Sequence, residues 1–253
     1  MKKINVAIYN EYYHEKTEPH IAAVYPKGMH QAIADALATE PEIGNIVLAT
    51  LDDHKEVLSN ECLDNTDVLY WWGHMKHREV DDDVVNYVCK RVNEGMGLVV
   101  LHSGHGSKVF HKLLGTNTGS LRWRESDDKC LVWVVSQGHP IVEGLPPCFE
   151  VPGDETYGEQ FSIPEPDELV LLSWFEGGEV FRSGCTFRRG SGRIFYFQNG
   201  HETYPIYFQP EVRRVINNAV RWVCPTQRRY HYDLGGGNAP AHEGPRIGEP
   251  KRK

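Results

Sequence analysis

Two histidines stand where α/β enzymes often carry their reacting groups. Residues 99–107 read VVLHSGHGS, so an apolar run enters a turn of small residues with His102 at its tip. His201 follows another β-rich run, residues 192–198, and lies in the sequence NGHE. Imidazole exchanges protons near neutral pH and is the commonest metal ligand among side chains. If both runs belong to one parallel sheet, both imidazoles reach the same edge of that sheet.

A carboxylate that could join them lies in the polar loop 153–157, which reads GDETY. In an extended stretch Asp154 and Glu155 point to opposite sides, so only one of them can face a given cleft. Glu155 and Tyr157 then share a side. We take Glu155 as the partner of the two histidines, because two imidazoles and one carboxylate with open positions form a common catalytic metal site.

Three chemical interpretations of His102, His201 and Glu155 stay open. The two histidines could act as an acid–base pair in proton transfer on a sugar-like substrate. With Glu155 as third ligand, they could hold one divalent metal ion, for which Zn²⁺ is the first choice. They could also hydrogen-bond a polyol without any chemistry. The sequence contains no tight zinc motif such as HExxH, and we predict no nucleotide cofactor.

Further side chains follow predicted strands or lie in the polar loop and could reach the same edge. Our candidates for substrate binding are Asn10, His74 and Tyr157. Trp71 and Trp72 are adjacent in a strand, so we expect one indole to face the core and the other to face outward. The outward indole could support a sugar ring.

Three other polar residues receive a structural interpretation. His14 and His20 flank a loop with several glutamates. They could contact a substrate at the rim of the site or bind a metal, but we favour the interpretation of this loop as a solvated surface. Ser103 follows His102, but the GxSxG pattern of a serine nucleophile requires glycine where Leu101 stands. We therefore assign Ser103 to a tight turn.

The elements that must position these residues alternate between strands and helices in the first part of the chain. Apolar runs predict strands at 3–9, 45–51, 66–72 and 98–101, and helical periodicity predicts helices at 27–39 and 80–94. The order β-α-β-β-α-β indicates an α/β fold. We expect a mostly parallel, doubly wound (flavodoxin-like) sheet with helices on both faces.

The second part of the chain adds antiparallel strands between Gly and Pro turns. The predicted elements are strands at 129–135, 168–174, 179–188 and 192–198, a loop at 151–163 and a closing helix at 210–223. We assign residues 1–224 to a single domain. Residues 225–253 are a Gly/Pro-rich C-terminal extension, which we expect to pack on the domain or on a neighbouring subunit. A homo-oligomer is therefore predicted.

Composition argues against several classes of partner. The net charge of −8 speaks against nucleic acid and anionic membrane surfaces, because both attract basic proteins. No apolar run approaches the roughly 20 residues of a membrane helix, and MKKINVAIYN does not read as a signal peptide. None of the six cysteines has CxxC spacing. We therefore expect reduced thiols and a cytoplasmic location.

Four short motifs in order carry a resemblance to a known family. They are WGH at 72–74, NEGMGLVVLHSG at 93–104, GDETY at 153–157 and NGHE at 199–202. Over roughly residues 3–224 the chain resembles the ThuA-like (trehalose-utilisation) family of the class I glutamine-amidotransferase-like superfamily. In true amidotransferases of this superfamily a cysteine stands at the tip of the turn. His102 stands there in this chain, and Thr203 occupies the place of the orienting glutamate. Because the amidase reaction needs a thiolate nucleophile, we exclude glutaminase activity.

The resemblance implies a small-molecule sugar as partner, trehalose or a related disaccharide. The leading hypothesis is an enzyme that isomerises, eliminates from or hydrolyses a keto-sugar, with His102 and His201 as the proton-transfer groups and Glu155 assisting. The alternative is a non-catalytic sugar-binding or regulatory protein on an amidotransferase-like scaffold. A third possibility is a role in subunit assembly, based on the C-terminal extension.

Overall fold

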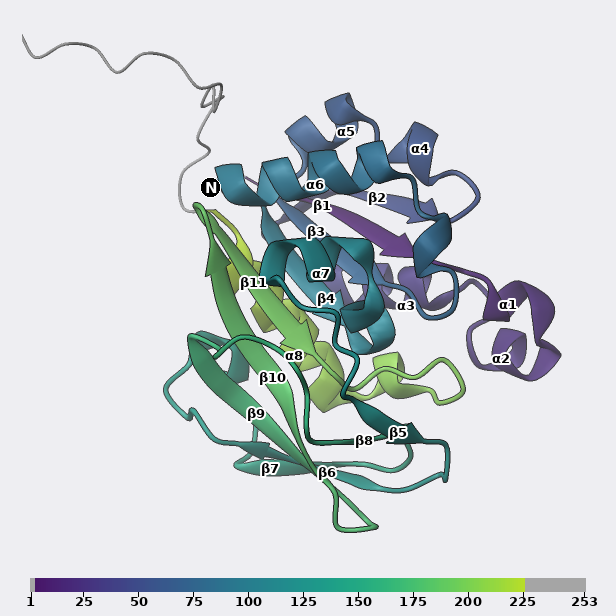
Figure 1. The fold of residues 1–253 in the computed structure, drawn as a ribbon, viewed down its shortest axis with the longest axis vertical. Helices are drawn as coiled ribbons and strands as arrows, with labels where there is room; N and C mark the ends of the chain where they lie inside the picture. The colour runs from purple at the N-terminus through teal and green to yellow at the C-terminus, as the bar shows by residue number, and fades with distance from the viewer. Residues whose placement is uncertain (1–2, 226–253) are drawn as a thin grey trace, which may run out of the picture.

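A nine-stranded sheet forms the centre of the protein, in a computed structural model that describes residues 3–225. Its parallel part has the order β2 (Ile43–Thr50), β1 (Ile4–Asn10), β3 (Val68–Trp72), β4 (Gly97–Leu101) and β11 (Gly192–Phe197). Antiparallel strands continue the sheet as β10 (Val180–Arg189), β9 (Glu168–Phe175), β6 (Cys130–Val134) and β7 (Cys148–Val151). The α/β class, with a mostly parallel region and added antiparallel strands, is therefore confirmed (Figure 1).

Helices cover both faces of the parallel part (Figure 1). On one face α3 (Met29–Leu37) packs against α8 (Pro210–Val223), and on the other face α6 (Asp82–Glu94) packs against α5 (Asn60–Asn65) and α7 (Lys108–Leu114). α6 begins where the Asp81 side chain accepts the N–H of Asp83, and it ends at Gly95 with φ 127°. Its inward valines at 84, 85, 88 and 92 recur at helical spacing and are buried.

Three details of the sequence prediction are wrong. Between β2 and β3 the chain forms α4 (His54–Val57) and α5, because it must cross back before starting another parallel strand. Helices of four to six residues leave little periodicity to detect. The predicted loop 151–163 contains β8 (Thr156–Gly158), which pairs with β5 (Arg122–Arg124). Trp71 and Trp72 are both 1% exposed, because elements cover both faces of the sheet.

The register of the parallel strands brings their carboxyl ends to one level. Asn10 pairs with Trp72, Trp72 pairs with Leu101, and Leu101 pairs with Phe197. The residues that follow β1, β3, β4 and β11 therefore meet at one edge of the sheet. This edge is where a ligand site is expected in a parallel α/β fold.

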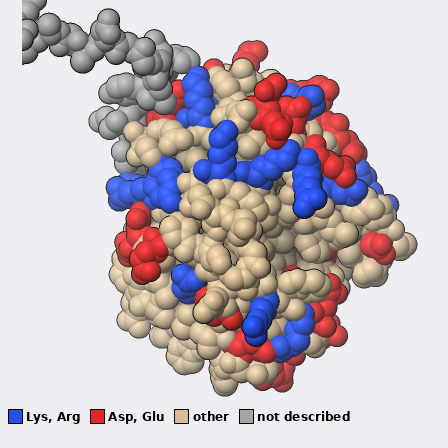
Figure 2. Space-filling view, in the orientation of Figure 1, with Lys and Arg blue, Asp and Glu red and all other residues tan. Residues whose placement is uncertain are grey.

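Short elements surround this edge. They are α1 (His14–Thr17), α2 (Pro19–Val24) and the 3-10 turns η1 (His77–Glu79), η2 (His102–Gly106) and η4 (Ile206–Phe208). The remaining 3-10 turn, η3 (Pro140–Val142), packs against α8 instead. On the face in Figure 2, basic and acidic side chains lie beside one another around an uncharged centre.

Among the described helices, none has the length and apolar composition to span a membrane. The predicted C-terminal extension lies outside the described residues, apart from its first residue.

Candidate functional site

The turns after β4 and β11 place the two predicted histidines side by side. The ring centroids of His102 and His201 are 5.3 Å apart. Gly200 makes the second turn possible: its φ is 149°, and a Cβ there would lie 2.1 Å from the Tyr207 hydroxyl oxygen. His102 itself has φ 47°, a left-handed conformation that costs a non-glycine residue about 1–2 kcal/mol. The surrounding structure must hold it there.

Both ring nitrogens of His102 have fixed partners. Nδ1 lies 2.7 Å from the carbonyl oxygen of Gln198, to which it must donate, and Nε2 lies 3.0 Å from Glu155 Oε2. The Tyr157 ring stacks on the imidazole at 5.0 Å. Burial of His102 opposes the imidazolium form, but the hydrogen bond and the charge of Glu155 outweigh burial and raise the pKa of His102 to about 9. At pH 7 the pair is therefore an imidazolium and a carboxylate.

His201 has the opposite protonation. Burial is the main cause that lowers the pKa of His201 to about 4, and the positive charge of His102 lowers it further. Its Nδ1 lies 3.3 Å from the backbone nitrogen of Thr203, which can only donate. The neutral ring therefore carries its proton on Nε2. This atom is buried, and no hydrogen-bond partner lies among the described residues.

Carboxylates surround the Nε2 atom of His201. It is 3.6 Å from Glu202 Oε2 and 3.9 Å from both Glu155 Oε2 and Glu125 Oε1. Glu202 Oε2 is likewise buried without a hydrogen-bond partner in the described part of the chain. A donor and an acceptor thus face each other at a distance that is longer than a hydrogen bond, so a bound group can interact with both.

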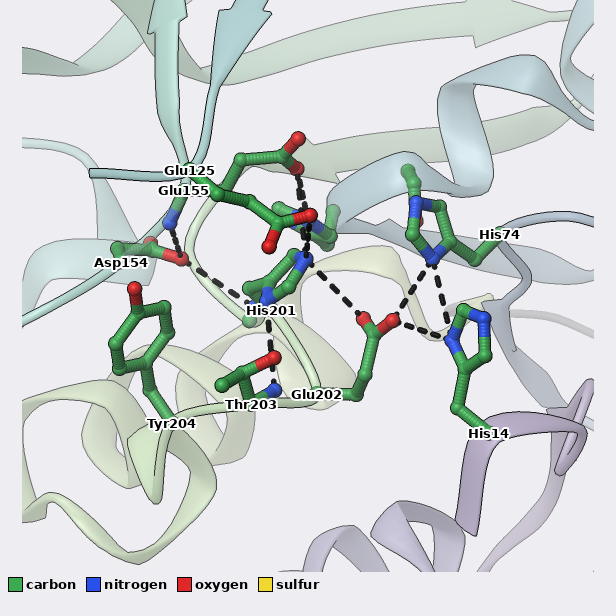
Figure 3. Close-up of polar contacts among 12 residues, drawn as sticks. His14, His74, Glu125, Asp154, Glu155, His201, Glu202, Thr203 and Tyr204 are labelled. Carbon is green, nitrogen blue, oxygen red and sulfur yellow. Dashed lines mark hydrogen bonds and ion pairs between the residues drawn. The ribbon is translucent and has the colours of Figure 1, made fainter. Parts of the chain in front are cut away.

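Glu202 stands between His201 and two further histidines (Figure 3). Its Oε1 contacts His14 Nδ1 and lies 2.8 Å from His74 Nδ1, and the two Nδ1 atoms are 3.4 Å apart. Burial raises the pKa of Glu202, but the hydrogen bonds with His14 and His74 lower it by more, so this pKa lies well below its ordinary value. The hydrogen bond with Glu202 raises the pKa of His14.

Two buried carboxylates hold the surrounding turns. Glu11 accepts the backbone N–H groups of residues 74, 75 and 76 at 2.8–2.9 Å, which shapes the turn after β3. Asp154 accepts from the backbone nitrogens of Glu155 and His201 and from the Asn199 side chain, which fixes the GDETY and NGHE segments together. Burial raises the pKa of Asp154 to about 6.

A cavity of about 450 Å³ opens onto this cluster. Its walls include His14, His74, His201 and Glu202, together with His20 and the indole of Trp123. The Trp123 residue is 63% exposed, which is unusual for such a large apolar side chain. His102 is fully buried beneath the cavity. The cavity therefore offers imidazole and carboxylate groups beside one aromatic surface.

The structure brings most, but not all, of the sequence candidates together. His102, His201, Glu155, His74 and Tyr157 lie in one cluster, and Ser103 Oγ donates to the Gly73 carbonyl as a turn residue would. Asn10 lies outside this cluster. Its amide is fully buried and bonds to Glu15 and His30.

Sequence reasoning missed Glu202 and Trp123, and for His14 it favoured the wrong one of two interpretations. Glu202 lies within the quoted motif NGHE and could have been weighed as a candidate beside His201. The interpretation of the His14 loop as a solvated surface is wrong for His14, which contacts buried Glu202. Trp123 lies in an irregular region between predicted strands and gave no signal of its own.

The metal ligand set predicted from sequence fits only in part. Because His102 Nδ1 donates to a carbonyl, Nε2 is the atom available to a metal, as is usual for ligand histidines. His201 Nε2 instead carries the proton, because Nδ1 accepts from Thr203. His201 can bind a metal through Nε2 only if this hydrogen bond is lost. The set of His102, His201 and Glu155 stays a prediction.

Comparison with solved structures shows the fold. A protein from Parabacteroides merdae described as ThuA-like aligns with a TM-score of 0.66 and 13% identity, over 90% of this chain and 93% of that chain. A second such protein, from Bacteroides uniformis, aligns with a TM-score of 0.60 and 17% identity, over 88% of this chain and 91% of that chain. A protein from Salmonella typhimurium LT2 that is described as cytoplasmic aligns with a TM-score of 0.61 and 11% identity, over 87% of this chain and 100% of that chain.

Comparison by sequence shows the family. No curated protein matches the chain. The family model described as ThuA, trehalose utilisation, matches residues 5–223, which is most of the sequence. The motifs at 72–74, 93–104, 153–157 and 199–202 all lie within this range. The structure brings one residue of each motif into a single cluster, namely His74, His102, Glu155 and His201. The chain therefore belongs to the ThuA family of trehalose utilisation.

Proposed function

We propose that this protein is an enzyme that transfers a proton next to the carbonyl group of a keto-sugar derived from trehalose or a related disaccharide. The observation that carries the proposal is the environment of His201. Its Nε2–H group is buried without a hydrogen-bond partner among the described residues and faces carboxylate oxygens at 3.6–3.9 Å, beside a cavity. A neutral imidazole N–H beside a carboxylate is suited to proton transfer at a carbon next to a carbonyl.

In the proposed step, His201 and Glu202 have complementary roles. The sugar carbonyl oxygen accepts a hydrogen bond from His201 Nε2–H. Glu202 Oε2 takes the proton from the neighbouring carbon, the C–H electron pair becomes the C=C bond of the enol, and the carbonyl oxygen receives the His201 proton. In isomerisation, Glu202 then returns its proton to the former carbonyl carbon, while the neighbouring hydroxyl gives its proton to His201 and becomes the new carbonyl. In elimination, the enol hydroxyl returns its proton to His201, the carbonyl re-forms, and the leaving group departs with the proton from Glu202. Isomerisation and elimination can both begin in this way, whereas hydrolysis also requires water as a reactant.

His102 and Glu155 act from beneath the cavity in this proposal. His102 is fully buried and Glu155 is 3% exposed, so we assign them to positioning. Glu155 Oε2 lies 3.0 Å from His102 Nε2 and 3.9 Å from His201 Nε2. Its negative charge therefore also helps to keep the proton of the His201 ring on Nε2. The sequence pattern goes further and predicts that His102 itself exchanges a proton with the substrate. This role stays a prediction, in addition to the proposed positioning role.

The exposed indole of Trp123 supports a carbohydrate as substrate. The face of an aromatic ring packs against the C–H groups of a pyranose ring, while hydroxyl groups hydrogen-bond to imidazoles and carboxylates. The cavity provides Trp123 together with His74 and Glu125. The family name adds trehalose as the sugar. A cytoplasmic location is part of the proposal, because one structural neighbour is titled a cytoplasmic protein.

The test is hydrogen exchange on trehalose oxidised to a ketone at one secondary hydroxyl. The protein is incubated with this keto-sugar in D₂O, and proton NMR follows the signals next to the carbonyl. We expect wild-type protein to catalyse exchange and His201→Gln to lose about 100-fold or more of this rate. His20→Gln is the matched control, because His20 lines the same cavity. Equal exchange by wild type and His201→Gln would contradict the proposal.

A non-catalytic sugar-binding protein is the second candidate function. The observation in its favour is that His102 and Glu155 pair with each other beneath the cavity and away from solvent. This candidate predicts that the keto-sugar binds, as seen by isothermal titration calorimetry, while wild-type protein leaves its exchange rate at the buffer value. Binding with catalysed exchange would reject it.

A further inference from the structure

Three metal-ligating atoms meet at the wall of the cavity. They are Nδ1 of His14, Nδ1 of His74 and Oε1 of Glu202. The two nitrogens are 3.4 Å apart, and the oxygen is within hydrogen-bonding distance of both. The residues come from α1, from the turn after β3 and from the turn after β11. Segments that are far apart in sequence thus direct their donor atoms to one point (Figure 3).

The hydrogen bonds of His14 indicate that a cation belongs at this point. Its Nε2 lies 3.0 Å from the Met75 sulfur, which can only accept, so Nε2 carries a proton. In a neutral ring, Nδ1 then presents a lone pair, and the Glu202 carboxylate opposite it also presents lone pairs. Two acceptors in contact require a cation between them, which is either a second imidazole proton or a metal ion.

The geometry and the supporting contacts suit a metal ion. In a tetrahedral zinc site, nitrogen ligands at 2.0–2.1 Å are about 3.3 Å apart, and the two Nδ1 atoms are 3.4 Å apart. The carboxylate oxygen is closer to both nitrogens than in such a complex, so a small carboxylate rotation accompanies binding. Glu11 holds the backbone of the His74 turn through three N–H groups, as a supporting contact for a ligand loop should.

The same donors leave room for a further ligand. The His14 and His74 side chains are 12% and 24% exposed and line the cavity of about 450 Å³, whereas Glu202 is buried. A metal held by them would keep open positions toward the cavity, as catalytic metal sites do. The other carboxylate oxygen, Oε2, would stay directed toward His201 Nε2 at 3.6 Å.

We infer that His14, His74 and Glu202 bind one divalent transition-metal ion at the wall of the cavity, with Zn²⁺ as the first choice. This ligand set differs from the one predicted from sequence and contains none of its three residues. It avoids His201, whose Nε2 carries a proton, and His102, which is paired with Glu155. When bound, such an ion would polarise a carbonyl or hydroxyl oxygen of a sugar in the cavity. The inference concerns the cavity of the proposed function but does not depend on the reaction.

The test is Zn²⁺ binding to the full chain after dialysis against a chelator. Isothermal titration calorimetry gives affinity and stoichiometry, and elemental analysis confirms the bound ion. We expect one Zn²⁺ per chain, and a loss of affinity of about 100-fold or more in each of His14→Ala, His74→Ala and Glu202→Gln. His20→Ala is the control at the cavity wall, and His102→Gln tests the set predicted from sequence. Both of these variants should keep wild-type affinity.

Several outcomes would overturn the inference. They are the absence of stoichiometric Zn²⁺ binding to wild type, unchanged affinity in His14→Ala and His74→Ala, and loss of binding in His102→Gln alone. If a ligand variant does not fold, an anomalous difference map of wild-type crystals soaked in Zn²⁺ decides, with the peak expected between the two Nδ1 atoms. If protein freed of metal by a chelator still catalyses hydrogen exchange on the keto-sugar, the proposed function holds without a metal. If the protein binds one Zn²⁺ per chain but does not catalyse this exchange, only the proposed function is contradicted.

Discussion

The buried pair of His102 and Glu155 makes a quantitative prediction about stability and pH. The pKa of His102 is about 9 in the fold, against an ordinary value of 6.5. Each pKa unit corresponds to about 1.4 kcal/mol, so proton binding to His102 contributes about 3 kcal/mol to the free energy of unfolding. Because the folded-state pKa is the higher one, this contribution is complete below pH 6.5 and is lost as the pH rises through 9.

The variant Glu155→Gln separates charge from hydrogen bonding at this position. Its amide can donate to the Nε2 lone pair of a neutral imidazole, while His102 Nδ1 still donates to Gln198. Without the carboxylate, burial keeps the imidazole neutral. We therefore expect wild-type protein to lose about 3 kcal/mol more between pH 6 and pH 9.5 than Glu155→Gln loses.

Urea unfolding at the two pH values measures this difference. The exposed Glu125 provides the control variant Glu125→Gln, because its carboxylate lies 3.9 Å from His201 but is 58% exposed. This control should follow the wild-type pH dependence. The titration of His102, followed by NMR of its ring proton, should move from about 9 in wild type to below 6.5 in Glu155→Gln. Equal losses of stability in wild type and Glu155→Gln would refute the reasoning.

Two further substitutions test the backbone and the cavity wall. Gly200→Ala should lower the free energy of unfolding by about 2 kcal/mol or more and the Tm by about 4–8 °C, because the new Cβ would meet the Tyr207 hydroxyl oxygen at 2.1 Å. Gly138→Ala, with open space around its Cβ, should change Tm little in the same thermal scan, and equal Tm values for both variants would contradict this account. Trp123→Ala should weaken keto-sugar binding about 5- to 10-fold in calorimetry without lowering Tm, because this indole is exposed beside the cavity. The control Trp174→Ala removes an indole that is 47% exposed on β9, and an equal loss of affinity there would count against a specific sugar contact.

Local patterns in the sequence were sufficient to predict the strands that carry the site and the turns that follow them. Short apolar runs predicted β1, β3, β4 and β11, because hydrophobic pattern is a local property of the chain. Parallel strands bring their carboxyl ends to one edge, so the sequence was sufficient to predict that His102 and His201 lie together. The ordered motifs predicted the family that the match over residues 5–223 confirms.

Long-range packing, in contrast, determines which groups face the cavity and in which protonation state. His14, His74 and Glu202 meet because α1 folds back over the edge of the sheet, and no periodicity in the sequence reports such a long-range contact. The same packing buries His102 against Glu155 and leaves His201 neutral. Burial and neighbouring charges set these pKa values, and both depend on residues that are distant in the chain. The sequence therefore identifies the residue types of the site, whereas the fold assigns their roles.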